Sequence, residues 1–421
     1  MTHALPTGFE QLEPIPEDRY AEWLNCWLTA LAEPLGTDPA VLEFYRRTYP
    51  AERGLAIADA DGIVATNISL DTQLVLPGGA RVPAVIGTGG FCHPTQTRRG
   101  LMSRLLDRIY ERAVDEGKVA CADWPSEWPI YRRFGHGPAA WYDAVRIDVR
   151  RAGLRDEVPG AGIRLRRVGG IDARDAARDV FTRRSHTAPG ELIPPDGFWD
   201  RFVTDPASSA LDALCTLDDP GGGVRQCAVL DGRGFVSYRI APGWSTEKAP
   251  DGVVHVVDFL AVDPEAAGAL WRFLFSIDMV AEIRVPRLPV DDPLRWWVTD
   301  ARWLHSRRRD GMWLRLLDIP AMLTARSWAG DGTVTVGVHD ARGWAAGTYH
   351  LEVDKGVGVC HRTTTEPDLE LEVSAMGAIV LGGTSAAGLF RAGEIRGDSG
   401  TVRLWDAMAT PERAPFLAYV L

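Results

Sequence analysis

GFCHPTQTRRGLMSRL, residues 90–105, is predicted to form the end of a strand, a short basic loop and the start of a helix. Apolar side chains recur every four positions from Leu101 to Ala113, as they do on one face of an amphipathic helix. A helix N-terminus offers unpaired N–H groups and a partial positive charge, and Arg98 and Arg99 add two formal charges there. The segment suits a pyrophosphate, although a basic helix start on a solvated surface has the same pattern.

The bulk composition indicates a multidomain globular protein. A chain of 421 residues is too long for one ordinary core, so two or three domains are expected. Charged residues make up 24% of the chain and hydrophobic residues 46%, close to average usage. The net charge of −11 argues against a nucleic-acid partner, because phosphate binding needs a basic face. It is compatible with a cationic substrate.

Neither the cysteines nor the N-terminus points to a metal site or to export. The six cysteines lie far apart and form no Cys-x-x-Cys pair, so we expect neither a zinc knuckle nor a disulfide framework. The first residues lack the basic stretch and apolar run of a secretory signal, and the chain has no apolar run of about 18 residues. We therefore expect no metal, no membrane partner and a cytoplasmic location.

The sequence divides into three segments. Residues 1–150 are mixed α/β and end on a strand at 140–149. In residues 151–297 the pattern of strand, X-Pro, short loop, glycine and helix recurs at Pro264, which predicts an internal duplication. That copy carries Asp263 and Glu265 but no arginine in its loop, and carboxylates there would repel a pyrophosphate. Residues 298–421 are predicted to form a small α+β domain that begins with a strand at 313–318 and carries no recognisable catalytic motif.

Strand, basic loop, glycine and helix, followed by a strand and a tyrosine, is the layout of the GNAT N-acyltransferases. Their acetyl-CoA motif, Q/R-x-x-G-x-G/A, is matched loosely, because Thr97 and Met102 occupy its first and last positions. The wider context resembles the Eis (enhanced intracellular survival) family over nearly the whole chain. The similar runs are HPT at 93–95, RRGL at 98–101, SE at 126–127, IYRRFGHGP at 130–138, DPL at 292–294, TDAR at 299–302 and DGMWLR at 310–315.

The resemblance implies an α+β fold with two tandem GNAT-like domains, the second degenerate, followed by a sterol-carrier-like domain. On this chain they would be a catalytic domain at 1–150, a degenerate domain at 151–297 and the sterol-carrier-like domain at 298–421. The implied activity moves the acetyl group of acetyl-CoA to a primary amine of an aminoglycoside-like or lysine/polyamine-like acceptor, in a homohexamer. The alternative is a catalytically weak protein whose C-terminal domain binds a hydrophobic ligand.

Matching positions also imply the site residues. Acetyl-CoA contacts would come from Gly90, Phe91, Cys92, Arg98, Arg99, Gly100, Leu101, Met102, Ser103, Ser126 and Glu127. Tyr131 matches the family's general acid, and the C-terminal carboxylate of Leu421 matches its general base. Asp310 is a candidate substrate contact, although a turn residue before a strand would look the same. His93 and His136 are interpreted as strand-end and turn residues.

The chemistry of acetyl transfer suits Tyr131 better than Leu421. A phenol has a reference pKa of about 10, above a thiol at about 8.5, so Tyr131 is protonated at neutral pH and can donate to a leaving thiolate. A terminal carboxylate has a reference pKa of about 3.5 and becomes a useful base only when burial raises it. The last residues, 415–421, are apolar enough to be buried, but they would also suit a final strand of the third domain.

Overall fold

The computed structural model describes residues 5–30, 39–204 and 223–420. The chain divides into two compact units, and neither is a continuous stretch of sequence. Unit 1 consists of Met1–Ala140, Leu192–Phe198 and Gly311–Pro415. Unit 2 consists of Trp141–Glu191, Trp199–Asp310 and Phe416–Leu421. Each unit is described separately below.

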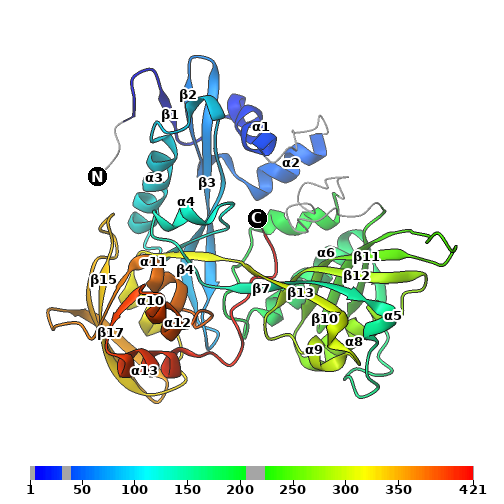
Figure 1. Cartoon of the computed structure of the whole chain (residues 1–421). Helices are drawn as coiled ribbons and strands as arrows, with labels where there is room; N and C mark the ends of the chain where they lie inside the picture. The colour runs from blue at the N-terminus through cyan, green and yellow to red at the C-terminus, as the bar shows by residue number, and fades with distance from the viewer. Residues whose placement is uncertain (1–4, 31–38, 205–222, 421) are drawn as a thin grey trace. The chain divides into compact units, whose positions relative to one another are not determined.

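A mixed sheet and four helices form the N-terminal part of unit 1. The strand order is β1-β2-β3-β4-β5-β14-β6, and β4 and β5 pair in parallel. The helix α3 packs on one side of this sheet and α1 on the other (Figure 1). The strands are β1 Glu10–Leu12, β2 Gly54–Asp59, β3 Gly62–Val75, β4 Arg81–Cys92, β5 Ala120–Asp123, β6 Gly137–Pro138 and β14 Trp313–Leu316. The helices are α1 Tyr20–Ala30, α2 Pro39–Thr48, α3 Leu101–Asp115 and α4 Trp128–Arg132.

The second part of unit 1 is a five-stranded sheet with order β17-β16-β15-β18-β19, together with four helices. Its α11 packs against β14 so closely that a Cβ on Gly137 of the neighbouring β6 would lie 1.8 Å from the carbonyl oxygen of Ser374. The strands are β15 Gly332–His339, β16 Gly347–Asp354, β17 Val357–Thr363, β18 Leu369–Glu372 and β19 Ile395–Gly397. The helices are α10 Ile319–Ala325, α11 Val373–Ile379, α12 Ala386–Arg391 and α13 Ser399–Ala409.

Unit 2 contains a seven-stranded sheet with order β13-β7-β12-β11-β10-β9-β8. Its core forms where α8 packs Leu270, Trp271 and Leu274 onto one face of the sheet. The strands are β7 Trp141–Asp148, β8 Arg166–Val168, β9 Gln226–Leu230, β10 Gly234–Ala241, β11 Gly252–Ala261, β12 Val280–Pro289 and β13 Leu304–Asp310. The helices are α5 Val149–Ala152, α6 Gly170–Arg184, α8 Pro264–Phe275 and α9 Leu294–Trp297.

Two strands belong to other sheets than the sequence segments predict. The sequence places residues 140–149 at the end of the first segment, but β7 pairs with β12 and β13 in the sheet of unit 2. It places 313–318 at the start of the third segment, but β14 lies between β5 and β6 in the sheet of unit 1. Strand partners far apart in sequence leave no local signal, so this placement is invisible to periodicity. The boundaries 1–150, 151–297 and 298–421 stay a proposal.

Several local predictions are confirmed. The helix expected from Leu101 is α3, and Gly117 follows it in the left-handed conformation, with φ +69°, that a helix-ending glycine adopts. The helix expected at Pro264 is α8, with Pro264 at its start and the Asp263 side chain capping it through the N–H of Ala266. Over the described part of the chain, no helix combines the length and apolarity that a membrane span needs.

Candidate active site

A bulge in β4 opens the candidate site. Thr66 of β3 pairs with Phe91, and Ile68 pairs with Thr88, so Gly89 and Gly90 of β4 together face the single residue Asn67. Gly89 has a φ of +62°, which favours glycine. The parallel pairing of β4 with β5 ends at Ile86 in the described structure. From Gly87 onward, the backbone groups of β4 are therefore not paired with β5.

The hydroxyl of Tyr131 lies beside this bulge. A Cβ built on Gly90 would lie 3.5 Å from Tyr131 Oη and 3.4 Å from Met102 Cε, so α4 and α3 both contribute to the wall around Gly90. The Tyr131 side chain is partly exposed, yet burial of its surroundings, followed by the nearby Asp123 and Cys121, raises the pKa of its phenol. Tyr131 is therefore held in its protonated form next to the opening in β4.

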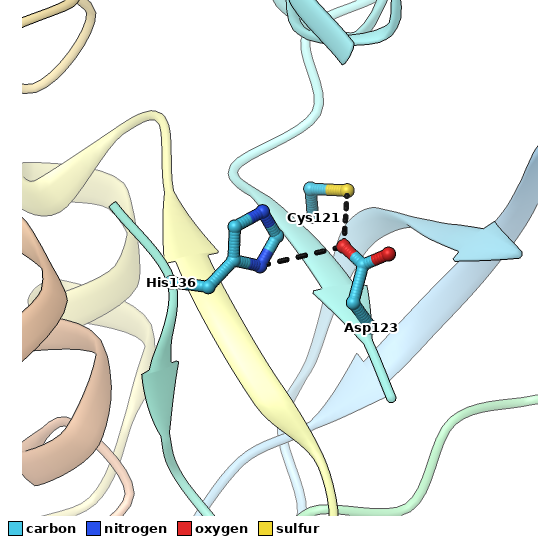
Figure 2. Close-up of side chains that lie close together, drawn as sticks. All are labelled: Cys121, Asp123 and His136. Atoms are coloured by element: carbon cyan, nitrogen blue, oxygen red, sulfur yellow. Dashed lines mark hydrogen bonds and ion pairs between the residues drawn. The ribbon is translucent and has the colours of Figure 1, made fainter. Parts of the chain in front are cut away.

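Near Tyr131 lie three buried polar side chains, those of Cys121, Asp123 and His136. Figure 2 shows Cys121 and His136 directed at the carboxyl group of Asp123. Asp123 Oδ2 lies 3.4 Å from Cys121 Sγ and 3.3 Å from His136 Nδ1. The second approach lacks hydrogen-bond geometry, because His136 Nδ1 has no hydrogen-bond partner among the described residues. On the other side of the ring, His136 Nε2 is 2.8 Å from Tyr110 Oη, and the ring meets that of Tyr131 edge-on at 5.6 Å.

This cluster is neutral rather than ionic. Burial raises the pKa of Asp123 well above its usual range, and the hydrogen bond with Cys121 opposes that shift only partly. Burial and then the charge of Arg315 lower the pKa of His136 well below its usual value. Burial also raises the pKa of the Cys121 thiol. A protonated acid beside a neutral imidazole avoids two buried charges.

Cys121, Asp123 and His136 are also residue types that bind zinc. One donor atom from each lies within 4.8 Å of the others. A structural zinc site takes four ligands, and the described residues bring three donor groups together here. The thiol and carboxyl groups would each have to lose a proton that burial holds in place. The cluster therefore fits a buried support for Tyr131 better than a metal centre.

The backbone of the basic loop before α3 is arranged so that it could bind an anion. Arg98 and Gly100 adopt left-handed conformations, with φ +63° and +81°, and the space around Gly100 is open. The first helical hydrogen bond runs from the N–H of Arg104 to the carbonyl of Gly100, so the N–H groups of Leu101, Met102 and Ser103 precede it. No described side chain caps this helix. Arg98 and Arg99 are exposed, and Arg99 lies over the ring of Phe9.

The structure gathers most of the predicted acetyl-CoA residues in unit 1. Gly90 and Met102 lie against Tyr131, and Phe91 and Cys92 complete β4 beside them. Burial raises the pKa of the Cys92 thiol. Ser126 and Glu127 are exposed immediately before α4. The other predicted contacts, Arg98 to Ser103, form the loop and first turn of α3.

The remaining predicted residues are Asp310, which belongs to unit 2, and Leu421. Asp310 ends β13 opposite Trp141 and so belongs to unit 2. Leu421 lies outside the described residues, while Phe416 to Val420 are buried or nearly so in unit 2. The roles of Asp310 and Leu421 stay predictions.

Sequence reasoning missed Asp123 and His136. The sequence predicts a turn residue at His136, but the tertiary structure buries its ring completely. One signal could have drawn attention to Asp123, because it ends VACAD, an otherwise apolar strand. The Asp123 carboxyl group also explains why position 87 is a glycine, because a Cβ there would lie 2.4 Å from Asp123 Oδ1.

Comparison with protein families identifies three domains in this chain. Residues 11–139 and residues 190–316 each match an acetyltransferase (GNAT) domain. Residues 319–418 match a sterol carrier protein domain. The expected fold class, two GNAT domains followed by a sterol-carrier-like domain, is thereby confirmed.

Whole-chain relatives agree with this organisation. An uncharacterized N-acetyltransferase of Streptomyces coelicolor is 32% identical over 90% of this chain and 92% of its own. The N-acetyltransferase Eis of Mycobacterium tuberculosis is 28% identical over 92% of this chain and 94% of its own. The crystal structure of Eis1 from Mycobacterium abscessus superposes with a TM-score of 0.81 at 26% identity, covering 98% of this chain and all of that one. The chain therefore belongs to the Eis family of GNAT N-acetyltransferases.

Proposed function

We propose that this N-acetyltransferase moves the acetyl group of acetyl-CoA to a primary amine of an aminoglycoside-like or lysine/polyamine-like acceptor. The observation that carries the proposal is the position of the protonated Tyr131 hydroxyl beside Gly90, at the bulge in the pairing of β4 with β3. A thioester laid along β4 would place its sulfur and carbonyl among these groups. The hydrophobic-ligand alternative has no comparable support, since named relatives are N-acetyltransferases.

The donor would bind along β4 and at the start of α3. Its pyrophosphate would take the N–H groups of Leu101 to Ser103 and the charges of Arg98 and Arg99. Gly100 has no Cβ, so the phosphate groups can approach its backbone closely. Its φ of +81° also favours glycine over other residues. The acetyl carbonyl would accept from a backbone N–H of Phe91 or Cys92, near the bulge. Ser126 and Glu127, ahead of α4, are proposed as further contacts.

Acetyl transfer needs proton movements at both ends of the reaction. The amine attacks the acetyl carbon, the C–S bond breaks, and the sulfur leaves as a thiolate that takes a proton. Tyr131 is proposed to donate that proton, since the raised pKa of its phenol keeps the hydroxyl protonated. The proton lost by the amine would pass to the carboxylate of Leu421, and Asp310 would attract the cationic acceptor. The homohexamer implied by the Eis resemblance is part of this proposal.

Release of free CoA thiol across a panel of amines tests the proposed reaction. Tyr131→Phe should reduce kcat by about a hundredfold or more, the usual contribution of a positioned acid, while acetyl-CoA affinity changes little. Equal turnover by both proteins would exclude Tyr131 as the acid. If no aminoglycoside, polyamine or lysine peptide releases thiol above the rate without amine, the proposed acceptor classes are wrong.

A further inference from the structure

A row of basic residues crosses the sheet of unit 2 in register. His255 of β11 pairs with Arg284 of β12, Arg284 pairs with Arg146 of β7, and Arg146 pairs with His305 of β13. These four strands lie side by side (Figure 1). Residues directly opposite each other in neighbouring strands point to the same face, so the four side chains form one row.

The row lies on the face opposite the unit 2 core. Val145, Val254 and Ile283, which alternate with the row, belong to the cluster that packs with α8. The basic face borders a groove of about 450 Å³ whose lining includes the row together with Arg307 and Arg309 of β13. A groove of this size accommodates a small molecule.

Positive charge in this groove exceeds the negative charge beside it. No carboxylate is among the described residues that line it. Two of the arginines share one carboxylate, that of Glu282, whose Oε2 lies 3.4 Å from Arg146 Nε and whose Oε1 accepts a hydrogen bond from Arg284 Nε. Arg307 and Arg309 form no ion pair with any described residue. One carboxylate for four arginines leaves an excess of positive charge, and an anion in the groove would balance it.

We propose that this groove binds a small molecule carrying a diphosphate or similarly clustered phosphate groups. Arginine guanidinium groups present forked donors that match phosphate oxygens. His255 at one end of the row is buried, and the other three strands at about 4.8 Å spacing give the accessible row a length of about 10 Å, enough for a diphosphate. A nucleic acid is a poorer match, because the chain as a whole has a net charge of −11 and would repel a longer polyanion.

Calorimetric titration of the full-length protein with pyrophosphate tests the groove. The titration uses a protein carrying Arg98→Ala and Arg99→Ala, so that the proposed acetyl-CoA loop does not add a second pyrophosphate site. Adding Arg307→Gln and Arg309→Gln should weaken binding at least tenfold, because charge-assisted contacts are lost. Neither arginine has an ion-pair partner to leave behind, so folding should be retained. Arg167→Gln, on β8 at the opposite edge of the same sheet, is the matched control and should change binding less than twofold.

Four results would overturn the proposal. They are an absence of pyrophosphate binding, an unchanged affinity in the Arg307→Gln, Arg309→Gln protein, an equal loss in the Arg167→Gln control, and binding of single-stranded DNA in preference to pyrophosphate. The mass of the assembly is measured in parallel by light scattering. If the two substitutions change that mass and pyrophosphate does not bind, the groove is an interface between copies of the chain.

Discussion

Asp123→Asn distinguishes a neutral Asp123–His136 pair from a buried ion pair. Both side chains are almost completely buried, with exposed fractions of 2% and 0%. If Asp123 is protonated, as the raised pKa of its carboxyl group indicates, asparagine replaces one neutral group by another of nearly the same shape. If Asp123 were ionised opposite an imidazolium, the same change would leave a buried charge without its partner.

The two cases predict different losses of stability. Replacing a neutral partner should reduce the free energy of unfolding by about 1 kcal/mol or less, or a fall in Tm of up to about 4 °C. Breaking a buried ion pair costs about 3–5 kcal/mol, or roughly 6–20 °C. Thermal unfolding at pH 7 measures the difference. Asp340→Asn is the control, because Arg315 lies 2.8 Å from Asp340, is fully buried and cannot give up its proton.

The pH dependence supplies a second test with a definite sign. A carboxyl group whose pKa is raised in the folded protein stabilises it below the unfolded pKa, about 3.9, and loses that contribution as the pH rises through the folded value. The Tm advantage of the native protein over Asp123→Asn should therefore shrink as the pH rises above about 4. A loss as large as that of Asp340→Asn, or an advantage that grows with pH, would refute the neutral pair.

Three further predictions concern packing, the donor site and the proposed base. Gly137→Ala should lower Tm by several degrees, since the new methyl group would meet the Ser374 carbonyl at 1.8 Å, whereas the methyl group of Gly330→Ala meets no atom closer than 3.7 Å and should leave Tm nearly unchanged. Arg98→Ala with Arg99→Ala should raise the KM for acetyl-CoA about tenfold or more in thiol-release assays, and an unchanged KM would assign the pyrophosphate to other groups. Extending the chain beyond Leu421 should lower kcat about a hundredfold with little change in acetyl-CoA binding, and a fully active extended protein would exclude the terminal carboxylate as the base.

Local sequence patterns predicted the elements around the candidate site well. Apolar residues at every fourth position from Leu101 predicted α3, and Gly117 predicted its end. The Pro264 junction located α8. These features depend on residues within one or two helical turns of each other, so a local stretch of sequence is enough to predict them.

The sequence did not reveal the bulge at Gly89 and Gly90 or the burial of His136. A bulge depends on the register with a partner strand, here the pairing of β3 with β4. The sequence predicts a turn residue at His136, but Asp123, Tyr110 and Arg315 surround its ring from other strands and helices. Contacts of this kind involve residues up to about 180 positions away, which no local pattern records.

By itself, the sequence determined the loop and helix that suit a pyrophosphate, the repeat of that pattern at Pro264, and the motifs shared with the Eis family. Only the tertiary structure decided which strands pair, and so placed β7 in the sheet of unit 2 and β14 in the N-terminal sheet of unit 1. The tertiary structure also set the Tyr131 hydroxyl of α4 beside Gly90, and strand register aligned four basic residues in one row across unit 2. The physical reason is that helix periodicity and capping are local interactions, whereas sheet register and burial are fixed by partners distant in the chain.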